Sequence, residues 1–455
     1  MPFRGRKEEG MLKHGKVLIF ATFFVFIVLI IGLATPGDSS GSGFNPPNGF
    51  VLYNATPKGS DWARAVAIQP DGKIVVVGVS YNGTNYRTLV LRFSNDGTRD
   101  NTFGTEGVFT YGDKEKGNHF GSGVALQPDG KIIVVGHSSS GEKREVLVIR
   151  CNSNGSLDST FWKGGVTRVT TSKGGEKESQ DLSFGVALQP DGKIVVVGAS
   201  YNGKNYEAML LRFNSDGSVD SSFGKGGNVT YTGPSNANVW GRAIAIQPDG
   251  KIVMVGVGYT AKKCDVLTMR YNPDGSLDKA FGEGGIALSA CPPGGQDFGR
   301  SIAIQPDGKI IVAGNTRSGG NINALLLRYN VNGTPDNTFG NGGFAIYKGL
   351  ANRSDWGRAV ALLPDGKIVI AGSSVSGPKC DALVARYNSD GTLDSSFGSG
   401  GIIVSNYLPD SNDWGFGAAI QKDGKIVVVG HARSGKNRNV LVMRYKPDGS
   451  PDASP

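Results

Sequence analysis

Large aromatic side chains recur in this chain of 455 residues at one position, ten residues before a repeated Asp-Gly pair. The residues at this position are Trp62, Phe120, Leu182, Trp240, Phe298, Trp356 and Trp414. Aspartates directly precede five of them, namely Asp61, Asp181, Asp297, Asp355 and Asp413. Indole rings can stack on sugars, and carboxylates can bind hydroxyl groups or exchange protons, so this set suits a glycan or a partner's side chain.

Two interpretations of this set stay open. As a ligand site it would comprise Trp62, Trp240, Phe298, Trp356, Trp414, Asp61, Asp297, Asp355 and Asp413. In the other interpretation the aromatic rings fill the seams between structural repeats, since large aromatic residues contribute strongly to packing.

The Asp-Gly pair belongs to a motif that organises residues 44–455. The motif reads Gln69-Pro70-Asp71-Gly72-Lys73-Ile74 in its first copy and recurs at intervals of 58, 62, 58, 58, 58 and 58 residues. Its seven glycines are Gly72, Gly130, Gly192, Gly250, Gly308, Gly366 and Gly424. An Asp-Gly pair between two apolar runs predicts a β-hairpin, here a two-residue type I′ turn with positive φ at both residues.

Each copy holds four short runs that are typical of strands. In the first copy they are residues 64–69, 74–78, 89–93 and 108–111, and a second Asx-Gly turn separates the last two. The apolar residues follow one another rather than alternate, which indicates strands covered on both faces. Because one four-stranded antiparallel unit cannot bury both faces, the copies must stack on one another.

The two ends of the repeat region complement each other. The seventh copy stops at residue 455 without its fourth run, whereas residues 44–53 resemble residues 103–111, which include that run. Complementary ends suit a ring, because a shared unit leaves no open sheet edge. The sequence therefore predicts an all-β fold, a seven-bladed β-propeller of four-stranded blades over residues 44–455, closed by its N-terminal strand.

The repeated unit Gln-Pro-Asp-Gly-Lys-Ile, continued by Arg-Tyr-Asn-x-Asp-Gly-Ser-Leu-Asp-x-x-Phe-Gly-x-Gly-Gly, resembles the delta-60 repeat family over residues 44–455. The resemblance implies a bacterial exported or surface protein and no general catalytic activity. Three residues depart from the pattern: Lys422 replaces Pro, Leu363 replaces Gln and Trp162 replaces Gly.

Other repeated or reactive residues favour structural roles. An arginine such as Arg92 and an aspartate such as Asp100 recur in every copy and are expected to pair. The Asn-x-Asp-Gly-x-x-Asp turns have too few carboxylates for a calcium loop. Cys264 and Cys291 are candidates for a disulfide in an oxidising compartment. The sequence indicates no cofactor, no metal site and no catalytic triad.

The first residues predict a membrane anchor. Residues 1–16 form a basic leader, 17–34 (Val17 to Ala34) are uncharged and apolar, and 35–43 have the composition of a flexible linker. The basic flank predicts a cytoplasmic N-terminus and a propeller outside the cytoplasm, in the periplasm or at the cell surface. The alternative is a cleaved signal peptide and a secreted protein. The net charge of +9 is too dispersed for nucleic-acid binding.

The predicted function is a membrane-anchored, exported propeller that serves as a binding or adhesion scaffold. The Pro-Asp-Gly-Lys turns define a constant face, and the variable connections define an opposite face that would meet an unidentified protein or glycan. The alternative is a glycan-active enzyme, a hydrolase or lyase, whose acid and base are the repeated aspartates at the mouth of the central channel.

Overall fold

The computed structural model describes residues 44, 49–54, 59–112, 116–171, 179–259, 263–289, 295–318, 320–349, 353–375, 377–408 and 410–453. The leader, the apolar segment 17–34 and the linker 35–43 lie outside these residues. The described residues belong to one compact unit. Among the described residues, no helix has the length and apolar character needed to cross a membrane.

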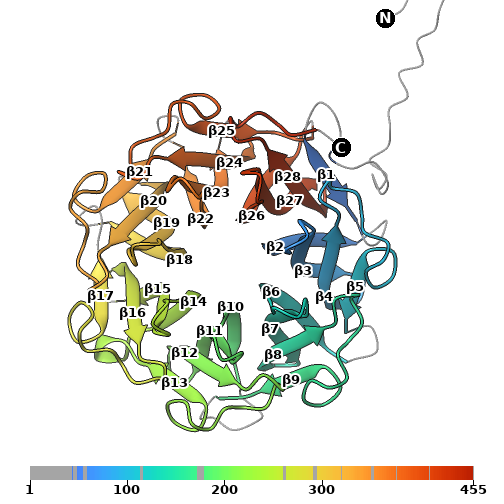
Figure 1. The fold of residues 1–455 in the computed structure, drawn as a ribbon, viewed down its shortest axis with the longest axis vertical. Coiled ribbons are helices and arrows are strands. Elements are labelled where there is room, and N and C mark those ends of the chain that lie inside the picture. The colour runs from blue at the N-terminus through green and yellow to red at the C-terminus, as the bar shows by residue number, and fades with distance from the viewer. Residues whose placement is uncertain are drawn as a thin grey trace, which may run out of the picture. The chain divides into compact units, whose positions relative to one another are not determined.

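Seven four-stranded antiparallel sheets form the propeller (Figure 1). Blade 1 consists of β2 (Ser60–Ile68), β3 (Ile74–Tyr81), β4 (Tyr86–Phe93) and β5 (Val108–Tyr111). Blade 2 consists of β6 (Asn118–Leu126), β7 (Ile132–Ser140), β8 (Lys143–Cys151) and β9 (Val166–Val169). Blade 3 consists of β10 (Leu182–Leu188), β11 (Ile194–Tyr201), β12 (Tyr206–Phe213) and β13 (Asn228–Tyr231), followed by the short 3₁₀ helix η1 (Pro234–Asn236).

The remaining blades repeat this order. Blade 4 holds β14 (Val239–Ile246), β15 (Ile252–Tyr259), β16 (Cys264–Tyr271) and β17 (Ile286–Ser289). Blade 5 holds β18 (Gln296–Ile304), β19 (Ile310–Ser318), β20 (Asn321–Tyr329) and β21 (Phe344–Tyr347). Blade 6 holds β22 (Asp355–Leu362), β23 (Ile368–Val375), β24 (Cys380–Tyr387) and β25 (Ile402–Ser405). Blade 7 holds β26 (Asn412–Ile420), β27 (Ile426–Ser434), β28 (Asn437–Tyr445) and β1 (Phe50–Tyr53). The seven-bladed, four-stranded architecture predicted from the sequence is confirmed.

The Asp-Gly turn differs from the predicted type I′ turn. Gly72 has φ of +88°, but Asp71 is not among the residues with positive φ. The Gly72 N–H donates to the Gln69 carbonyl at 2.9 Å, and the Gln69 N–H donates to the Lys73 carbonyl at 2.8 Å. Pro70 and Asp71 therefore form the centre of a type I turn, and Gly72 supplies the left-handed residue that follows it. Pro70 suits the first central position of this turn, but it is not required, since blade 7 forms the same hydrogen bonds with Lys422 at that position.

The apolar core lies between blades rather than within one. A typical cluster joins Val195 and Val197 of β11 to Ile252 and Met254 of β15, all buried. The same arrangement recurs at the other seams. Each sheet is thus apolar on both faces, as the unbroken apolar runs predicted.

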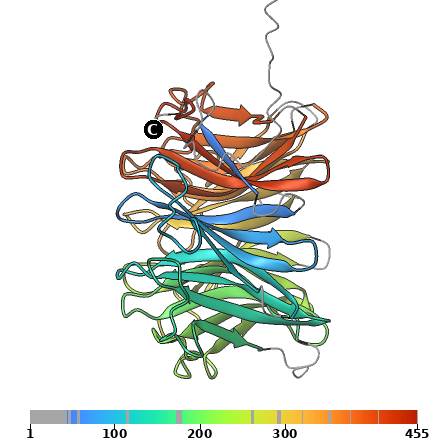
Figure 2. The ribbon, with the colours of Figure 1, turned by 90° about the vertical axis from the view of Figure 1, so that its right-hand side faces the viewer.

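Blade 7 combines both ends of the propeller. β1 pairs antiparallel with β28, Phe50 opposite Met443 and Tyr53 opposite Val440, and Figure 2 shows this strand against the blade-7 strands. Phe44 donates its N–H to the Asp96 carbonyl of blade 1 at 3.2 Å, and its ring lies 4.1 Å from the Arg444 guanidinium. In the other blades the phenylalanine that begins the Phe-Gly segment takes this place; Phe103, for example, lies 4.6 Å from Arg92.

A buried charge cluster joins each blade to the next on the constant face. In blade 5, Asp336 accepts hydrogen bonds from the Arg328 Nε at 2.7 Å and the Thr338 hydroxyl at 2.6 Å, and it pairs with the Lys309 ammonium at 2.9 Å. Arg328 also donates to the Ser389 carbonyl in the next blade. Burial alone would raise the pKa of Asp336, but the hydrogen bonds from Thr338 and Lys309 and the Arg328 charge lower it.

Replacing Asp336 by Ala should destabilise the propeller by about 3–5 kcal/mol, because Arg328 would stay buried without its counter-ion. The measurement is the urea midpoint of unfolding. The control is Asp307→Ala, which removes a carboxylate of the same blade that is 57% exposed and 4.0 Å from Lys309; that change should cost about 1 kcal/mol or less. Equal losses of stability in the two variants would contradict the role of Asp336 as the counter-ion of buried Arg328.

Candidate functional site

The inner strands of the seven blades surround the propeller axis (Figure 1). In blades 2, 4, 5, 6 and 7 their first halves share one pattern of exposure, seen in blade 6 as buried Asp355, half-buried Trp356, buried Gly357 and half-buried Arg358. Blades 1 and 3 differ, since Trp62 and Leu182 are buried. The aromatic position is the one singled out from the sequence. The position two residues later escaped that analysis; it holds Arg64, Ser122, Phe184, Arg242, Arg300, Arg358 and Phe416. We call the residues at these two positions the axial ring.

A β-bulge places the second position of the axial ring in every blade. The pairing of β14 with β15 shifts between Gly241 and Ala243, so that Arg242 is an extra residue without a partner across the ladder. The same shift occurs at the equivalent residue in the other inner strands. A bulge redirects a side chain out of the regular alternation. Here it leaves the residue partly exposed on the inner edge of the blade.

A glycine in the second strand permits this bulge. A Cβ on Gly256 of the second strand would lie 1.8 Å from the Trp240 carbonyl oxygen of the inner strand. A backbone approach this close excludes any side chain. The Gly241 position is less restricted, because blades 1 and 3 carry Ala63 and Ser183 there. The second-strand glycine recurs in every blade and is the sequence signature of the bulge.

Four arginines converge on the axis without counter-ions. In the part of the chain that the structure describes, Arg64, Arg242, Arg300 and Arg358 form no ion pair. The Nε atoms of Arg300 and Arg358 are buried and have no hydrogen-bond partner. Desolvation, followed by the charges of Arg300 and Arg64, lowers the pKa of Arg242 to about 10. The same causes in the same order lower the pKa of Arg358 to about 10. Positive groups from blades 1, 4, 5 and 6 thus repel one another across the axis.

Aromatic faces alternate with these guanidinium groups. The Arg242 guanidinium lies 4.3 Å from the ring centre of Phe184 and 5.2 Å from that of Trp240. The Arg358 guanidinium lies 4.6 Å from the ring centre of Phe416. Cation–π contacts of this kind hold the guanidinium planes beside the rings and leave their edges for an anion.

The aromatic residues of the ring also pack at the seams between blades. Trp240 lies 4.2 Å from Tyr206 and Phe120 lies 5.2 Å from Tyr86, measured between ring centres, and each of these tyrosines belongs to the preceding blade. Trp62 is capped at 5.4 Å by the guanidinium of Arg438 from blade 7. Both interpretations of the aromatic set therefore keep structural support: the rings pack against the neighbouring blade, and all of them except the buried Trp62 remain partly exposed.

The repeated aspartates are buried beside the axial ring. Asp61, Asp181, Asp297, Asp355 and Asp413 are each 0% exposed. Asp355 accepts a hydrogen bond from the Gly349 N–H at 2.7 Å, and Asp413 accepts one from the Tyr407 N–H at 2.7 Å. Both donors belong to the chain that arrives from the outer strand of the preceding blade. Burial raises the pKa of both carboxyl groups. These carboxylates thus bind the backbone of the connection between blades. Because they are buried, they do not share an exposed surface with the aromatic residues.

Two histidines pack against aromatic residues of the axial ring. His431 lies 4.6 Å from Trp414 and 5.3 Å from Phe416, and His137 lies 4.6 Å from Phe120, between ring centres. Desolvation, together with nearby arginines, lowers the pKa of each to about 3, so both are neutral near pH 7. Within the described residues no group of His, Cys, Asp and Glu could hold a metal ion. Cys264 is buried, and the predicted partner Cys291 lies outside the described residues.

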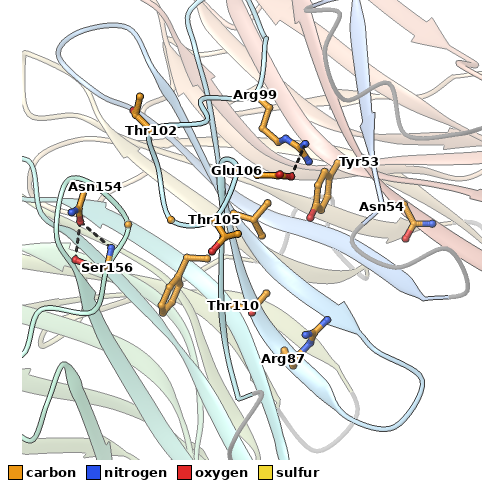
Figure 3. Close-up of a pocket in the computed structure, with 14 residues that line it drawn as sticks. Tyr53, Asn54, Arg87, Arg99, Thr102, Thr105, Glu106, Thr110, Asn154 and Ser156 are labelled. Atoms are coloured by element: carbon orange, nitrogen blue, oxygen red, sulfur yellow. Dashed lines mark hydrogen bonds and ion pairs between the residues drawn. The ribbon is translucent and has the colours of Figure 1, made fainter.

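Apart from the axial ring, a hollow of about 960 Å³ lies at the outer side of the junction between β1 and blade 1 (Figure 3). Its lining includes Tyr53, Arg99 and Glu106. The Arg99 guanidinium pairs with the Glu106 carboxylate at 3.7 Å and lies 5.9 Å from the Tyr53 ring. Because this charge is compensated locally, the hollow is a weaker candidate for an anion than the axial ring.

Seven segments of the chain match the family described as "Domain of unknown function (DUF5122) beta-propeller": 69–103, 127–161, 189–223, 247–281, 305–339, 363–397 and 421–454. The chain belongs to this family. The match confirms a repeat β-propeller family, and no curated protein matches the chain.

Solved structures similar to the chain include the polysaccharide lyase Uly1, with 11% identity over 85% of this chain and 90% of that chain and a TM-score of 0.49. A protein of unknown function from Dyadobacter fermentans has 13% identity over 87% of this chain and 97% of its own, with a TM-score of 0.43. The WD40 propeller domain of Doa1 has 15% identity over 88% and 99%, with a TM-score of 0.45.

Replacing Arg300 by Met should increase the free energy of unfolding by about 1 kcal/mol, because a partly buried charge without a counter-ion is removed. Urea unfolding measures the change. Arg317→Met, which removes an exposed arginine of the same blade, should change stability by less than about 0.5 kcal/mol. A large loss in Arg300→Met alone would show that Arg300 is needed for packing.

Proposed function

We propose that this protein is an exported binding propeller whose axial ring takes an acidic saccharide. The observation that carries the proposal is the convergence of four guanidinium groups that lack counter-ions beside partly exposed aromatic rings. Guanidinium groups bind carboxylates and sulfates with paired hydrogen bonds, and aromatic faces cover the apolar faces of sugar rings. An anion bound at this place also relieves the repulsion among the arginines.

Binding without turnover is the function that this geometry supports best. The glycan-active alternative needs two of the repeated aspartates to reach a substrate, whereas Asp297 and Asp355 are both 0% exposed. Among the described residues, the buried Nδ1 atoms of His137 and His431 have no hydrogen-bond partner, so no carboxylate orients either ring through that atom. The axial ring lies in the first halves of the inner strands, next to the variable connections, so that it opens toward the predicted recognition face.

The test is isothermal titration of the full-length protein with oligogalacturonate, a chondroitin sulfate oligosaccharide and a neutral malto-oligosaccharide of similar length. We expect binding of an acidic probe that weakens as salt concentration rises. Arg242→Met and Arg358→Met should each weaken it about tenfold or more, the loss of one charge-assisted contact. Arg317→Met is the matched control and should bind as the parent does. Equal binding of the neutral probe would refute the proposal.

The pH dependence of this binding separates arginine from histidine recognition. His137 and His431, with pKa values of about 3, are neutral from pH 6 to pH 8.5, while Arg242 and Arg358, with pKa values of about 10, stay charged. Affinity for an acidic probe should therefore be constant over that range. A loss of affinity as pH rises through 7 would indicate that a protonated histidine holds the anion.

We further infer that the repeats are of the delta-60 type and that residues 17–34 anchor the propeller to a membrane, with its variable face outward. The repeated motif and the uncharged apolar run support these two inferences. If the anchor is correct, the full chain stays in the membrane fraction after an alkaline wash, and a chain that begins at residue 44 does not. Recovery of both chains in the soluble fraction would refute the anchor.

A further inference from the structure

Trp162 stands where five of the other blades have glycine. The equivalent residues, which follow the first phenylalanine of the connection to the outer strand, are Gly104, Gly224, Gly282, Gly340 and Gly398. All five glycines have positive φ, and Trp162 keeps the same left-handed backbone with φ of +40°. This conformation is disfavoured for a residue with a large side chain. Blade 2 therefore holds a tryptophan at a site where glycine would fit without strain.

Packing does not account for this tryptophan. The Trp162 side chain is 47% exposed, the largest aromatic exposure among the described residues. Its backbone N–H donates to the Asp216 carbonyl of the next blade at 2.6 Å, a contact that the glycines of other blades also make. The indole is thus not needed for the contact between blades. Backbone strain together with an exposed aromatic ring is the pattern expected of a binding residue.

Cationic and aromatic side chains surround the indole. A hollow of about 370 Å³ is lined by Tyr111, Trp162, Lys163, Val166 and Arg168. The Lys163 ammonium lies 6.0 Å from the indole ring centre. Arg168 donates from Nη2 to the Tyr111 hydroxyl at 2.7 Å, and its guanidinium lies 5.9 Å from the tyrosine ring. Among the described residues that line the hollow, Lys163 and Arg168 are cationic and none is acidic.

The hollow is separate from the axial ring. Arg168 belongs to β9, the outermost strand of blade 2, whereas the axial ring belongs to the innermost strands (Figure 1). A ligand at one place does not depend on a ligand at the other.

We propose that the hollow around Trp162 binds an acidic sugar residue of a polysaccharide. The indole covers one face of the sugar ring, and Lys163 binds its carboxylate or sulfate group. The concave shape and the single exposed indole favour a saccharide over a lipid surface, which would need a protruding apolar group.

Trp162→Gly is the decisive variant, because it restores the residue that other blades carry. It should fold with a melting temperature equal to or above that of the parent, since the backbone strain is removed. The binding experiment is isothermal titration of the full-length protein that carries Arg242→Met and Arg358→Met. With the axial site weakened, the heat of titration measures binding at the hollow. Oligogalacturonate and chondroitin sulfate are the probes, and the comparison between them distinguishes carboxylate from sulfate recognition.

Adding Trp162→Gly to this background should weaken the remaining binding at least tenfold. Lys163→Met should weaken it severalfold, whereas Lys225→Met, at the equivalent position in blade 3 beside Gly224, should leave it unchanged. Equal binding with and without Trp162→Gly would overturn the proposal. A change of Trp162 fluorescence with anionic lipid vesicles but not with either saccharide would also overturn it, in favour of a membrane contact. Because the axial arginines are already replaced, failure here leaves the proposal for the axial ring untouched.

Discussion

Each blade has two apolar faces, and only the neighbouring blades can cover them. This constraint explains why the core lies at the seams, where Val197 of one blade meets Met254 of the next. It also explains the buried charges of the constant face. Arg328 binds Asp336 in its own blade and the Ser389 carbonyl in the next, so one side chain fixes both the turn of its blade and the distance to its neighbour. Every seam around the propeller therefore has an apolar middle and an arginine contact of this kind at the constant face.

The axial ring uses the one residue of each inner strand that this packing does not need. Because the bulged residue has no partner across the ladder, arginine, serine and phenylalanine can all occupy it without changing the blade. The glycine of the second strand, such as Gly256, cannot vary in the same way, since the carbonyl oxygen that faces it leaves no room for a side chain. A fixed residue on the second strand thus supports a variable residue on the inner strand.

The repeat unit and the architecture could be predicted because turn motifs and apolar runs are local features with a fixed period. The pairing of Arg92 with Asp100 could be predicted for the same reason, and the structure places them 2.8 Å apart. The turn type was wrong because the two central residues of the turn are Pro70 and Asp71, and Gly72 follows them, whereas the prediction placed Asp71 and Gly72 at the centre. The arginines of the axial ring were overlooked because a bulge interrupts the regular alternation of side chains along a strand. The direction of a bulged side chain cannot be predicted from that alternation. The location of Asp355 depends on the chain that arrives from the preceding blade, which no pattern within one repeat contains.

The sharing of blade 7 has a consequence for the order in which the molecule is made. Phe50 and Met443 pair although about 390 residues separate them, so β1 leaves the ribosome long before β28 exists. Blades 1 to 6 are continuous in sequence and can assemble as the chain emerges, whereas β1 must wait unpaired until β28 has been made. The ring is therefore completed last, and quality control that senses an unpaired strand edge would act on the unfinished seventh blade.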